Sequence, residues 1–176
     1  MIKLKETNSV SYSGEIISLY TDCFSKGLSQ QFIDQTELHQ YIAFILKNGT
    51  ALLAIENEKI EGALLSYPMG FDPDIPEIIK SGFDINKSVY IAELMVSEAL
   101  RGQGIGLNLM NEFLNSTDKS TYKEAFIRVW ELNLPALELY KKLGFSPVAS
   151  IIQMKKNIGD NGIFEMKKLY LHKKLI

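Results

Sequence analysis

The longest apolar run lies in the middle of the chain. Residues 89–96 are apolar except for Glu93, and such a run is typical of a strand buried on both faces. A turn with glycines at 102, 104 and 106 follows. After this turn, apolar residues recur at helical spacing from Ile105 to about Ser116. The pattern therefore predicts a buried strand, a glycine turn and an amphipathic helix in direct succession.

The rest of the chain alternates between strand-like and helix-like patterns. Strands are expected at 2–5, 50–56, 60–67, 89–96, 124–131, 148–155 and 164–174. Helices are expected at 13–24, 34–47, 105–116 and 133–143, with Ser13, Asp34 or Thr36, and Asn133 as candidate caps. No repeat, low-complexity tract or linker divides residues 1–176, which predicts one mixed α/β domain.

Three connections between these elements carry loop or turn signals. Residues 68–87 contain prolines and glycines and predict an irregular insertion with one turn of helix near Ile78. This insertion is either a surface loop or a wall of a substrate pocket, and the pattern leaves both open. The polar stretch 25–35 predicts a loop, and Gly-Asp-Asn-Gly at 159–162 predicts a hairpin turn.

The glycine turn suggests an anion-binding site. Glycines let the backbone approach a ligand closely, and the first N–H groups of a helix have no partner within it. A phosphate or diphosphate satisfies these groups and the helix dipole together. The spacing excludes the dinucleotide fingerprint G-x-G-x-x-G, and there is no P-loop lysine. What remains is Arg-x-x-Gly-x-Gly from Arg101 to Gly106, directly after the strand.

Composition excludes several classes of function. A formal net charge of −2 argues against a nucleic-acid-binding protein, and no apolar run approaches the ~20 residues that span a bilayer. Cys23 is the single cysteine, and His39 and His172 lack metal-ligand spacing, so we expect neither a disulfide nor a metal site. Without an N-terminal signal segment, a cytoplasmic protein is expected.

A second segment identifies the family. The stretch from Asn133 to Phe145 reads NLPALELYKKLGF. Together with Arg-x-x-Gly-x-Gly, it resembles the GNAT superfamily of acetyl-CoA-dependent N-acetyltransferases, in which both motifs occur in this order. The resemblance covers residues 89–148. It implies one GNAT domain with a mostly antiparallel mixed sheet of about seven strands, splayed in the middle, and about four helices on its faces.

The resemblance also implies where acetyl-CoA binds. Arg101 and the backbone of Gly102, Gln103, Gly104, Ile105 and Gly106 would hold the diphosphate. The strand edge at Leu94, Met95 and Val96 would pair with the pantetheine arm, and Met95 would donate its N–H to the thioester oxygen. Asn133 would contact the coenzyme arm, although a role as helix cap alone would also explain it.

Two residues are implied in catalysis. Glu93, the only charged residue of its strand, would be the general base that deprotonates the amine, and Tyr140 would donate a proton to the leaving thiolate. Glu93 could instead pair with a cation across the sheet, and Tyr140 could simply belong to the core. The acceptor is an amine-bearing substrate, with Tyr20, Phe24, Phe32 and residues 68–87 as candidates for its pocket.

One alternative function and the state of assembly stay open. A coenzyme A-binding regulatory module would share the fold without turnover, although the presence of both Glu93 and Tyr140 favours an enzyme. A homodimer is plausible for the family, and we expect no nucleic-acid or membrane partner.

Overall fold

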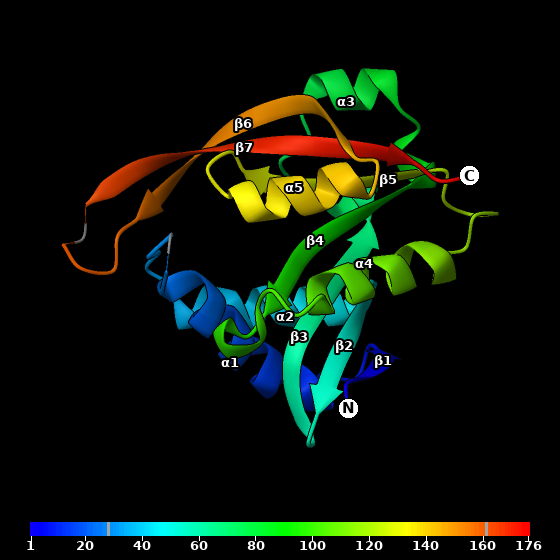
Figure 1. Ribbon diagram of the computed structural model, residues 1–176. Helices are drawn as coiled ribbons and strands as arrows, with labels where there is room; N and C mark the ends of the chain where they lie inside the picture. Colours follow the sequence, from blue (N-terminus) through cyan, green and yellow to red (C-terminus); the bar gives the residue numbers. More distant parts are fainter. Residues whose placement is uncertain (28, 161) are drawn as a thin grey trace.

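The computed structural model describes residues 1–27, 29–160 and 162–176. These residues form seven strands and five α-helices (Figure 1). The strands are β1 (Lys3–Thr7), β2 (Thr50–Glu56), β3 (Lys59–Pro68), β4 (Ser88–Val96), β5 (Glu124–Trp130), β6 (Ser146–Lys156) and β7 (Ile163–Lys174). The helices are α1 (Ser13–Ser25), α2 (Gln35–Asn48), α3 (Glu77–Gly82), α4 (Ile105–Ser116) and α5 (Leu134–Lys142).

The strands form one sheet in the order β1-β2-β3-β4-β5-β7-β6. Only β4 and β5 run parallel, and every other neighbouring pair is antiparallel. Helix α4 connects the two parallel strands, as a parallel pair requires a crossover. The expected mostly antiparallel mixed sheet of seven strands is confirmed.

Each face of the sheet carries its own apolar core. Ile16 of α1 and Ile42 of α2 pack on one face, together with Tyr90 of β4. Leu109 of α4 and Tyr140 of α5 pack on the other. Strands with apolar residues on both faces fit the near-continuous apolar run that marked β4 in the sequence.

Strands β4 and β5 separate halfway along their length, as Figure 1 shows. Their pairing covers only Ser88–Ile91 of β4, opposite Glu124–Ile127 of β5. On the other side of β4, Ile91 pairs with Ser66 of β3 and Glu93 pairs with Leu65, so Ala92 is an extra residue, a β-bulge. The splayed sheet therefore leaves the second half of β4 without a neighbour toward β5.

Several expected boundaries differ from the structure for local reasons. Ser13 does not cap α1, because a 3-10 turn at Val10–Tyr12 precedes the helix and Tyr12 takes the cap position. Of the two candidates for α2, Asp34 is the cap, and its carboxylate accepts from the N–H of Glu37 at 2.9 Å. Asn161, in the expected turn at 159–162, and Leu28, in the expected loop at 25–35, lie outside the described residues.

The insertion contains a fifth helix, α3, where one turn of helix was expected. Met69, Ile75 and Ile79 of this segment are buried in the core on the side of α1 and α2. The insertion is therefore anchored in the core by these side chains, while Phe71 and Ile78 are exposed, and its role as a pocket wall stays a prediction.

Within the described ranges, no helix combines the length and the apolar character needed to cross a bilayer.

Gly49 fixes how α2 turns into β2, and replacing it by alanine should destabilise the fold by about 1–3 kcal/mol. A Cβ at this position would lie 1.9 Å from the backbone oxygen of Ser66, so the two strands would have to move apart. The midpoint of urea unfolding measures the effect. Gly14→Ala is the matched control, since nothing lies within 4 Å of its added Cβ and alanine favours a helix. Equal midpoints for the two variants would contradict the close approach at Gly49.

Candidate functional site

The turn between β4 and α4 carries backbone N–H groups without acceptors. Gly102 and Gly104 have left-handed φ values of 77° and 82°, which glycine adopts without steric cost. Gly104 takes the cap position of α4, and no side chain caps this end. Among the described residues, the N–H groups of residues 102–107 find no hydrogen-bond acceptor. We call these groups the amide cluster; with the helix dipole, they suit a diphosphate.

The amide cluster includes the backbone N–H groups of Gln103, Ile105 and Gly106, and packing around α4 fixes the last two residues. The side chain of Ile105 is buried in the core under α4, so it offers a ligand only its backbone. A Cβ at Gly106 would lie 3.6 Å from the side chain of Leu139 and 3.8 Å from that of Leu94. Gly106 therefore lies where α4, α5 and β4 meet, which brings the cluster to the opening of the splayed strands.

Alternation along β4 decides which backbone groups face the gap. The N–H of Ser97 donates to the oxygen of Glu61 at 2.8 Å, and Met95 pairs with Ala63 of β3. In an antiparallel ladder, hydrogen bonding to one neighbour alternates along the strand. The N–H of Met95 therefore points to β3, whereas Leu94 and Val96 present N–H and C=O groups to the gap. The N–H of Met95 therefore does not face the gap, and the N–H of Leu94 is the one placed for the contact with the thioester oxygen that was expected of Met95.

The carbonyl oxygen of Val96 already has two contacts in the gap. The Nε–H of Arg101 donates to it at 3.2 Å, and the thiol of Cys23 donates at 3.5 Å. Arg101 is otherwise exposed, so its guanidinium lies beside the amide cluster and the strand edge together. A ligand amide that pairs with Val96 has to replace these contacts.

Helix α5 brings Asn133 and Tyr140 to the other side of the gap. Asn133 caps α5, accepting from the N–H of Ala136 at 3.4 Å, so its role as a cap is confirmed. Tyr140 is only 5% exposed and packs against Phe145. No described residue forms a hydrogen bond with its hydroxyl. Burial raises the pKa of Tyr140, and the nearby charge of Glu93 raises it further, so the hydroxyl keeps its proton at neutral pH.

Glu93 is half-buried at the point where the strands separate. The hydroxyl of Tyr41 donates to its Oε1 at 3.0 Å. Burial raises the pKa of Glu93, while the ammonium of Lys168 and the Tyr41 hydrogen bond oppose this shift. The described residues include no ion-pair partner of Glu93 within 4.0 Å, which speaks against a purely structural salt bridge across the sheet.

The bulge at Ala92 determines the face on which Glu93 lies. Without the extra residue, Glu93 would share a face with Val89 and Ile91, under α4. The bulge turns it to the face of Tyr90 and Met95, which α1 and α2 cover. Glu93 thereby meets Tyr41, a residue that sequence reasoning missed, although its spacing three residues after Leu38 places it on the inner side of α2.

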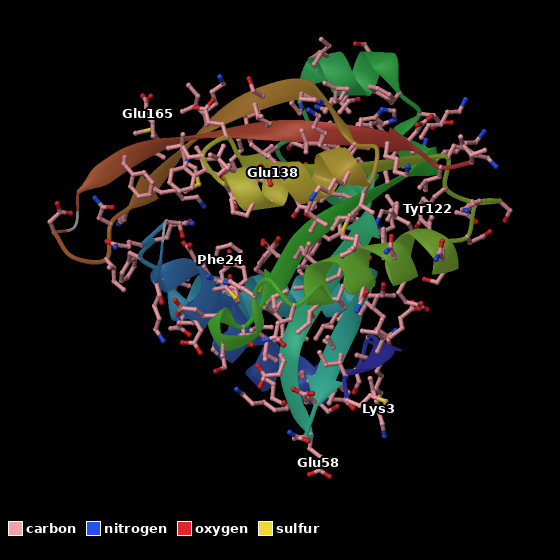
Figure 2. The ribbon with its side chains drawn as sticks, viewed as in Figure 1. Lys3, Phe24, Glu58, Tyr122, Glu138 and Glu165 are labelled. Carbon is pink, nitrogen blue, oxygen red and sulfur yellow. The ribbon has the colours of Figure 1, made fainter. Side chains whose placement is uncertain are left out.

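The residues proposed for the acceptor pocket lie mostly on this face. The rings of Tyr20 and Phe24 lie 4.5 Å apart, and those of Tyr20 and Tyr41 lie 6.3 Å apart. Burial and the charge of Glu93 raise the pKa of Tyr20. Figure 2 shows Phe24 at the end of α1. Phe32 is half exposed, and its N–H donates to the oxygen of Lys156 at 2.8 Å.

The insertion is held at the same face by a network of polar contacts, in which Asp72 is buried and Asp74 is partly exposed. Asp72 accepts from the hydroxyl of Tyr170 at 2.8 Å, and Asp74 accepts from Arg128 of β5 at 3.1 Å. Arg128 in turn donates to the hydroxyl of Tyr170 at 2.9 Å. Asp74 also accepts from Gln153 of β6 at 3.1 Å. These contacts hold residues 72–74 on the face where the acceptor pocket is expected.

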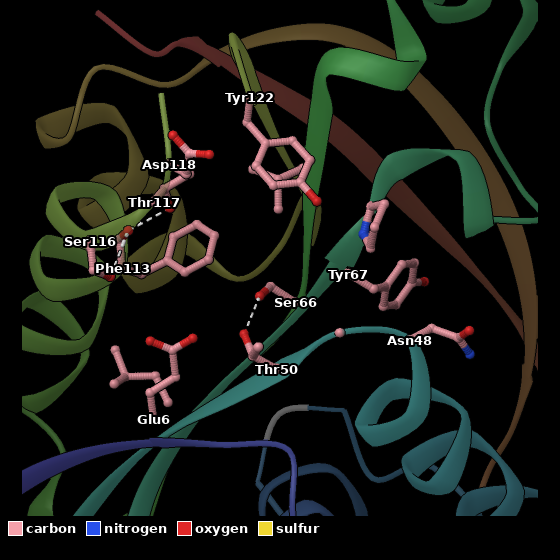
Figure 3. A pocket seen from close by; sticks show the side chains of 14 residues that line it. Glu6, Asn48, Thr50, Ser66, Tyr67, Phe113, Ser116, Thr117, Asp118 and Tyr122 are labelled. Carbon is pink, nitrogen blue, oxygen red and sulfur yellow. Dashed lines mark hydrogen bonds between the residues drawn. The ribbon is translucent and has the colours of Figure 1, made fainter. Parts of the chain in front are cut away.

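A separate cavity of about 410 Å³ lies at the opposite end of α4 (Figure 3). Its lining includes Glu6, Phe113, Asp118 and Tyr122, and Asp118 is engaged in a turn with Ser120. The amide cluster is at the other end of the same helix, so this cavity takes no part in the candidate site. Within the part of the chain that the structure describes, no group of three or more His, Cys, Asp or Glu side chains could hold a metal ion.

A splayed sheet with an amide cluster at its opening defines a domain that can hold a coenzyme with a diphosphate and an extended arm. The model of the acetyltransferase (GNAT) family matches residues 14–145. Since this range is most of the chain, the protein belongs to the GNAT acetyltransferase family.

The comparisons with individual proteins agree with this assignment. The chain is 32% identical over 98 residues to an N-alpha-acetyltransferase of Sulfolobus acidocaldarius, covering 51% of this chain and 54% of that protein. It is 36% identical over 63 residues to the chloroplastic GCN5-related N-acetyltransferase 6 of Arabidopsis thaliana, covering 36% of this chain. The chain thus spans about half of the first relative and 22% of the second.

Among solved structures, the ribosomal-protein-alanine N-acetyltransferase of Brucella melitensis has a similar fold. The TM-score is 0.70 at 18% identity, and the match covers 99% of each chain. At this identity the likeness concerns the fold, and it confirms the GNAT-like architecture.

Proposed function

We propose that this protein transfers an acetyl group from acetyl-CoA directly to a primary amine. The observation that carries the proposal is the position of the amide cluster at the open end of a splayed β4–β5 pair, with Glu93 and Tyr140 beside the gap. Orphaned N–H groups of this kind fit a diphosphate. When bound, acetyl-CoA supplies an activated acetyl thioester. Gly102, Gln103, Gly104, Ile105, Gly106 and Arg101 would hold its diphosphate, and Leu94 and Val96 would pair with its amide-bearing arm.

Glu93 acts as the general base in this proposal. An amine with a pKa of ~10.4 needs about 4.6 kcal/mol to lose its proton at pH 7. A carboxylate that only attracted the ammonium would oppose this step, so the base has to accept the proton, directly or through a water. The raised pKa of Glu93 brings its basicity closer to that of the amine.

Leu94 and Tyr140 act on the two sides of the reacting bond. The N–H of Leu94 points into the gap and donates to the carbonyl oxygen, which gains negative charge during attack by the amine. Tyr140 is the proposed acid, and its hydroxyl donates a hydrogen bond to the sulfur of the leaving thiolate. The pKa of Tyr140 lies above that of an ordinary thiol, so the hydroxyl first stabilises the thiolate by this hydrogen bond.

Tyr140→Phe should lower kcat by about 10- to 100-fold and leave the affinity for coenzyme A nearly unchanged. Phenylalanine fills the same buried volume, and no described residue loses a hydrogen bond with the hydroxyl. Steady-state kinetics and a coenzyme A titration measure the two effects. If affinity falls and kcat stays constant, Tyr140 is a binding residue and not the acid.

The decisive experiment for the proposal is a turnover assay over a panel of amines, run beside a binding titration with acetyl-CoA. Release of free thiol that depends on an added amine supports an enzyme. Binding of acetyl-CoA without release of thiol for any amine would favour the alternative, a non-catalytic coenzyme A-binding module. We further propose that residues 1–176 act as one catalytic domain in the cytoplasm, without a nucleic-acid or membrane partner. Light scattering distinguishes a monomer from a homodimer.

A further inference from the structure

Two lysines of the β6–β7 hairpin, Lys155 and Lys168, lie on the face where the acceptor pocket is expected. Both are far from Glu93 in the sequence. Lys168 of β7 is two residues from Tyr170, and Lys155 of β6 is four residues from Ile151. Tyr170 and Ile151 both pack into the core on the face of α1 and α2. Because side chains alternate along a strand, both lysines lie on this face. It is the face to which the bulge turns Glu93, and the charges of both lysines act on Glu93.

These lysines have no anionic partner in the described structure. Both are half-buried, and neither forms an ion pair within 4.0 Å, whereas Arg128 and Lys167 each do. Burial lowers the pKa of Lys168 to about 8 and also lowers that of Lys155. Because partial burial disfavours an unpaired ammonium, a carboxylate or similar anion would stabilise both side chains.

The neighbouring carboxylates of Asp72 and Asp74 already have hydrogen-bond and ion-pair partners. Asp72 and Asp74 bind Arg128 and the hydroxyl of Tyr170. Glu93 acts on both lysines and accepts from Tyr41, and Glu37 of α2 acts in addition on Lys155. Lys155, Lys168 and Glu93 together carry a net positive charge, which suits an anionic group on the ligand.

A second polar group beside Lys155 also lacks a partner. Gln153 shares the face of Lys155, and its amide nitrogen donates to Asp74. Its Oε1 is buried and accepts no hydrogen bond from any described residue. A cavity of about 420 Å³ opens here, lined in part by Asp74, Gln153 and Lys155. A buried acceptor without a donor indicates a ligand or water that the chain does not supply.

The α1–α2 loop closes one end of this region. The N–H of Phe32 donates to the oxygen of Lys156 at 2.8 Å, and the N–H of Ile158 donates to the oxygen of Gln30 at 3.1 Å. Gln31 and Asn157 form a β-bridge between the same segments. Figure 1 shows the α1–α2 loop meeting the β6–β7 hairpin. This strap (residues 30–32 with 156–158) ties the α1–α2 loop to the hairpin next to Lys155, where it would limit the room for a polypeptide and so favour a short acceptor.

We propose that the acceptor is a small amino acid whose carboxylate is bound by Lys155 and Lys168 while its amino group lies at Glu93. This inference rests on the proposed acetyl transfer. The carboxylate supplies the anion that the lysines lack, and the amino group is the nucleophile that Glu93 deprotonates.

The test compares the common α-amino acids with their α-amides as acceptors. The amide has the less basic amine and is more often unprotonated at neutral pH, so a preference for the acid cannot come from amine protonation. The wild type should prefer at least one acid over its amide. Lys168→Met and Lys155→Met should each lower kcat/KM for the acid about 10-fold or more, with a smaller effect on the amide. The acid-to-amide ratio is the readout, because removing Lys168 also changes the charge around Glu93.

A matched control comes from the same hairpin. Lys167→Met removes an exposed ammonium group next to Lys168 in sequence, at a position that alternates to the other face. This control should keep the wild-type ratio. Equal use of acids and amides by the wild type, or acetylation only of peptides and other amines, would overturn the inference while acetyl transfer itself stands.

A second readout does not depend on turnover. Trace labelling with an amine-reactive ester, followed by mass spectrometry, reports how accessible Lys155 and Lys168 are. N-acetyl amino acids should protect both lysines, and the corresponding N-acetyl amino acid amides should not. Protection without acetylation of any amine would refute the proposed enzyme and keep the carboxylate site. Labelling unchanged by the acids would refute the carboxylate site.

Discussion

Glu93→Gln should lower kcat/KM for the amine by about 100- to 10,000-fold, the usual contribution of a general base. Glutamine keeps the size of the side chain and can still accept from the hydroxyl of Tyr41, so the change removes basicity and little else. The wild-type rate should rise with pH through the pKa of Glu93, which burial raises above its ordinary value. The variant should lack that rise, and pH–rate profiles of both proteins measure the difference.

The same substitution separates catalysis from structure. A carboxyl group whose pKa is raised in the folded protein stabilises the fold at low pH, where it is protonated, and this stabilisation is lost as pH rises through the folded pKa. Glutamine avoids that loss, so the variant should be as stable as the wild type or more stable at neutral pH. Thermal unfolding at pH 4 and pH 8 checks this sign. A variant that is much less stable at pH 8 would show that Glu93 is a structural ion-pair partner.

Gly104→Asp should weaken the binding of acetyl-CoA by about 100-fold or more. The new carboxylate would lie at the cap of α4, within the amide cluster, where the diphosphate is proposed to bind. Like charges placed side by side cost several kcal/mol, and each ~1.4 kcal/mol is tenfold in affinity. The added Cβ meets no atom within 4 Å, and aspartate tolerates left-handed φ better than most residues, so the variant should fold.

Gly104→Asn is the matched control for this variant. Asparagine has the same shape and the same backbone strain at a φ of 82° but no charge. Its affinity for acetyl-CoA, measured by calorimetry, should stay well above that of the aspartate variant. Equal affinities for both variants and the wild type would place the diphosphate elsewhere.

Local patterns in the chain predicted the secondary structure because they depend on neighbours in sequence. The glycine turn, the cap at Asn133 and the strand of residues 89–96 are confirmed with small changes at their ends. The turn of helix expected near Ile78 is confirmed as α3, whose six residues are too few to show a clear helical period. The candidate site was predicted where binding depends on the backbone, since an exposed helix N-terminus has the same free N–H groups in any fold.

Other features depend on residues that are distant in sequence. A single extra residue, Ala92, reverses the face of Glu93, and no residue pattern marks a bulge of this kind. The choice of Leu94 in place of Met95 as the donor in the gap follows from the register against β3, which alternation within β4 alone does not reveal.

The sequence by itself determined the order of strands and helices and the position of the amide cluster, because these follow from local backbone geometry and from apolar periodicity. Only the tertiary structure decided what surrounds Glu93. Tyr41 comes from α2, and Lys155 and Lys168 come from the β6–β7 hairpin. The physical reason is that burial and nearby charge set the pKa of a carboxyl group, and both arise from contacts between segments far apart along the chain.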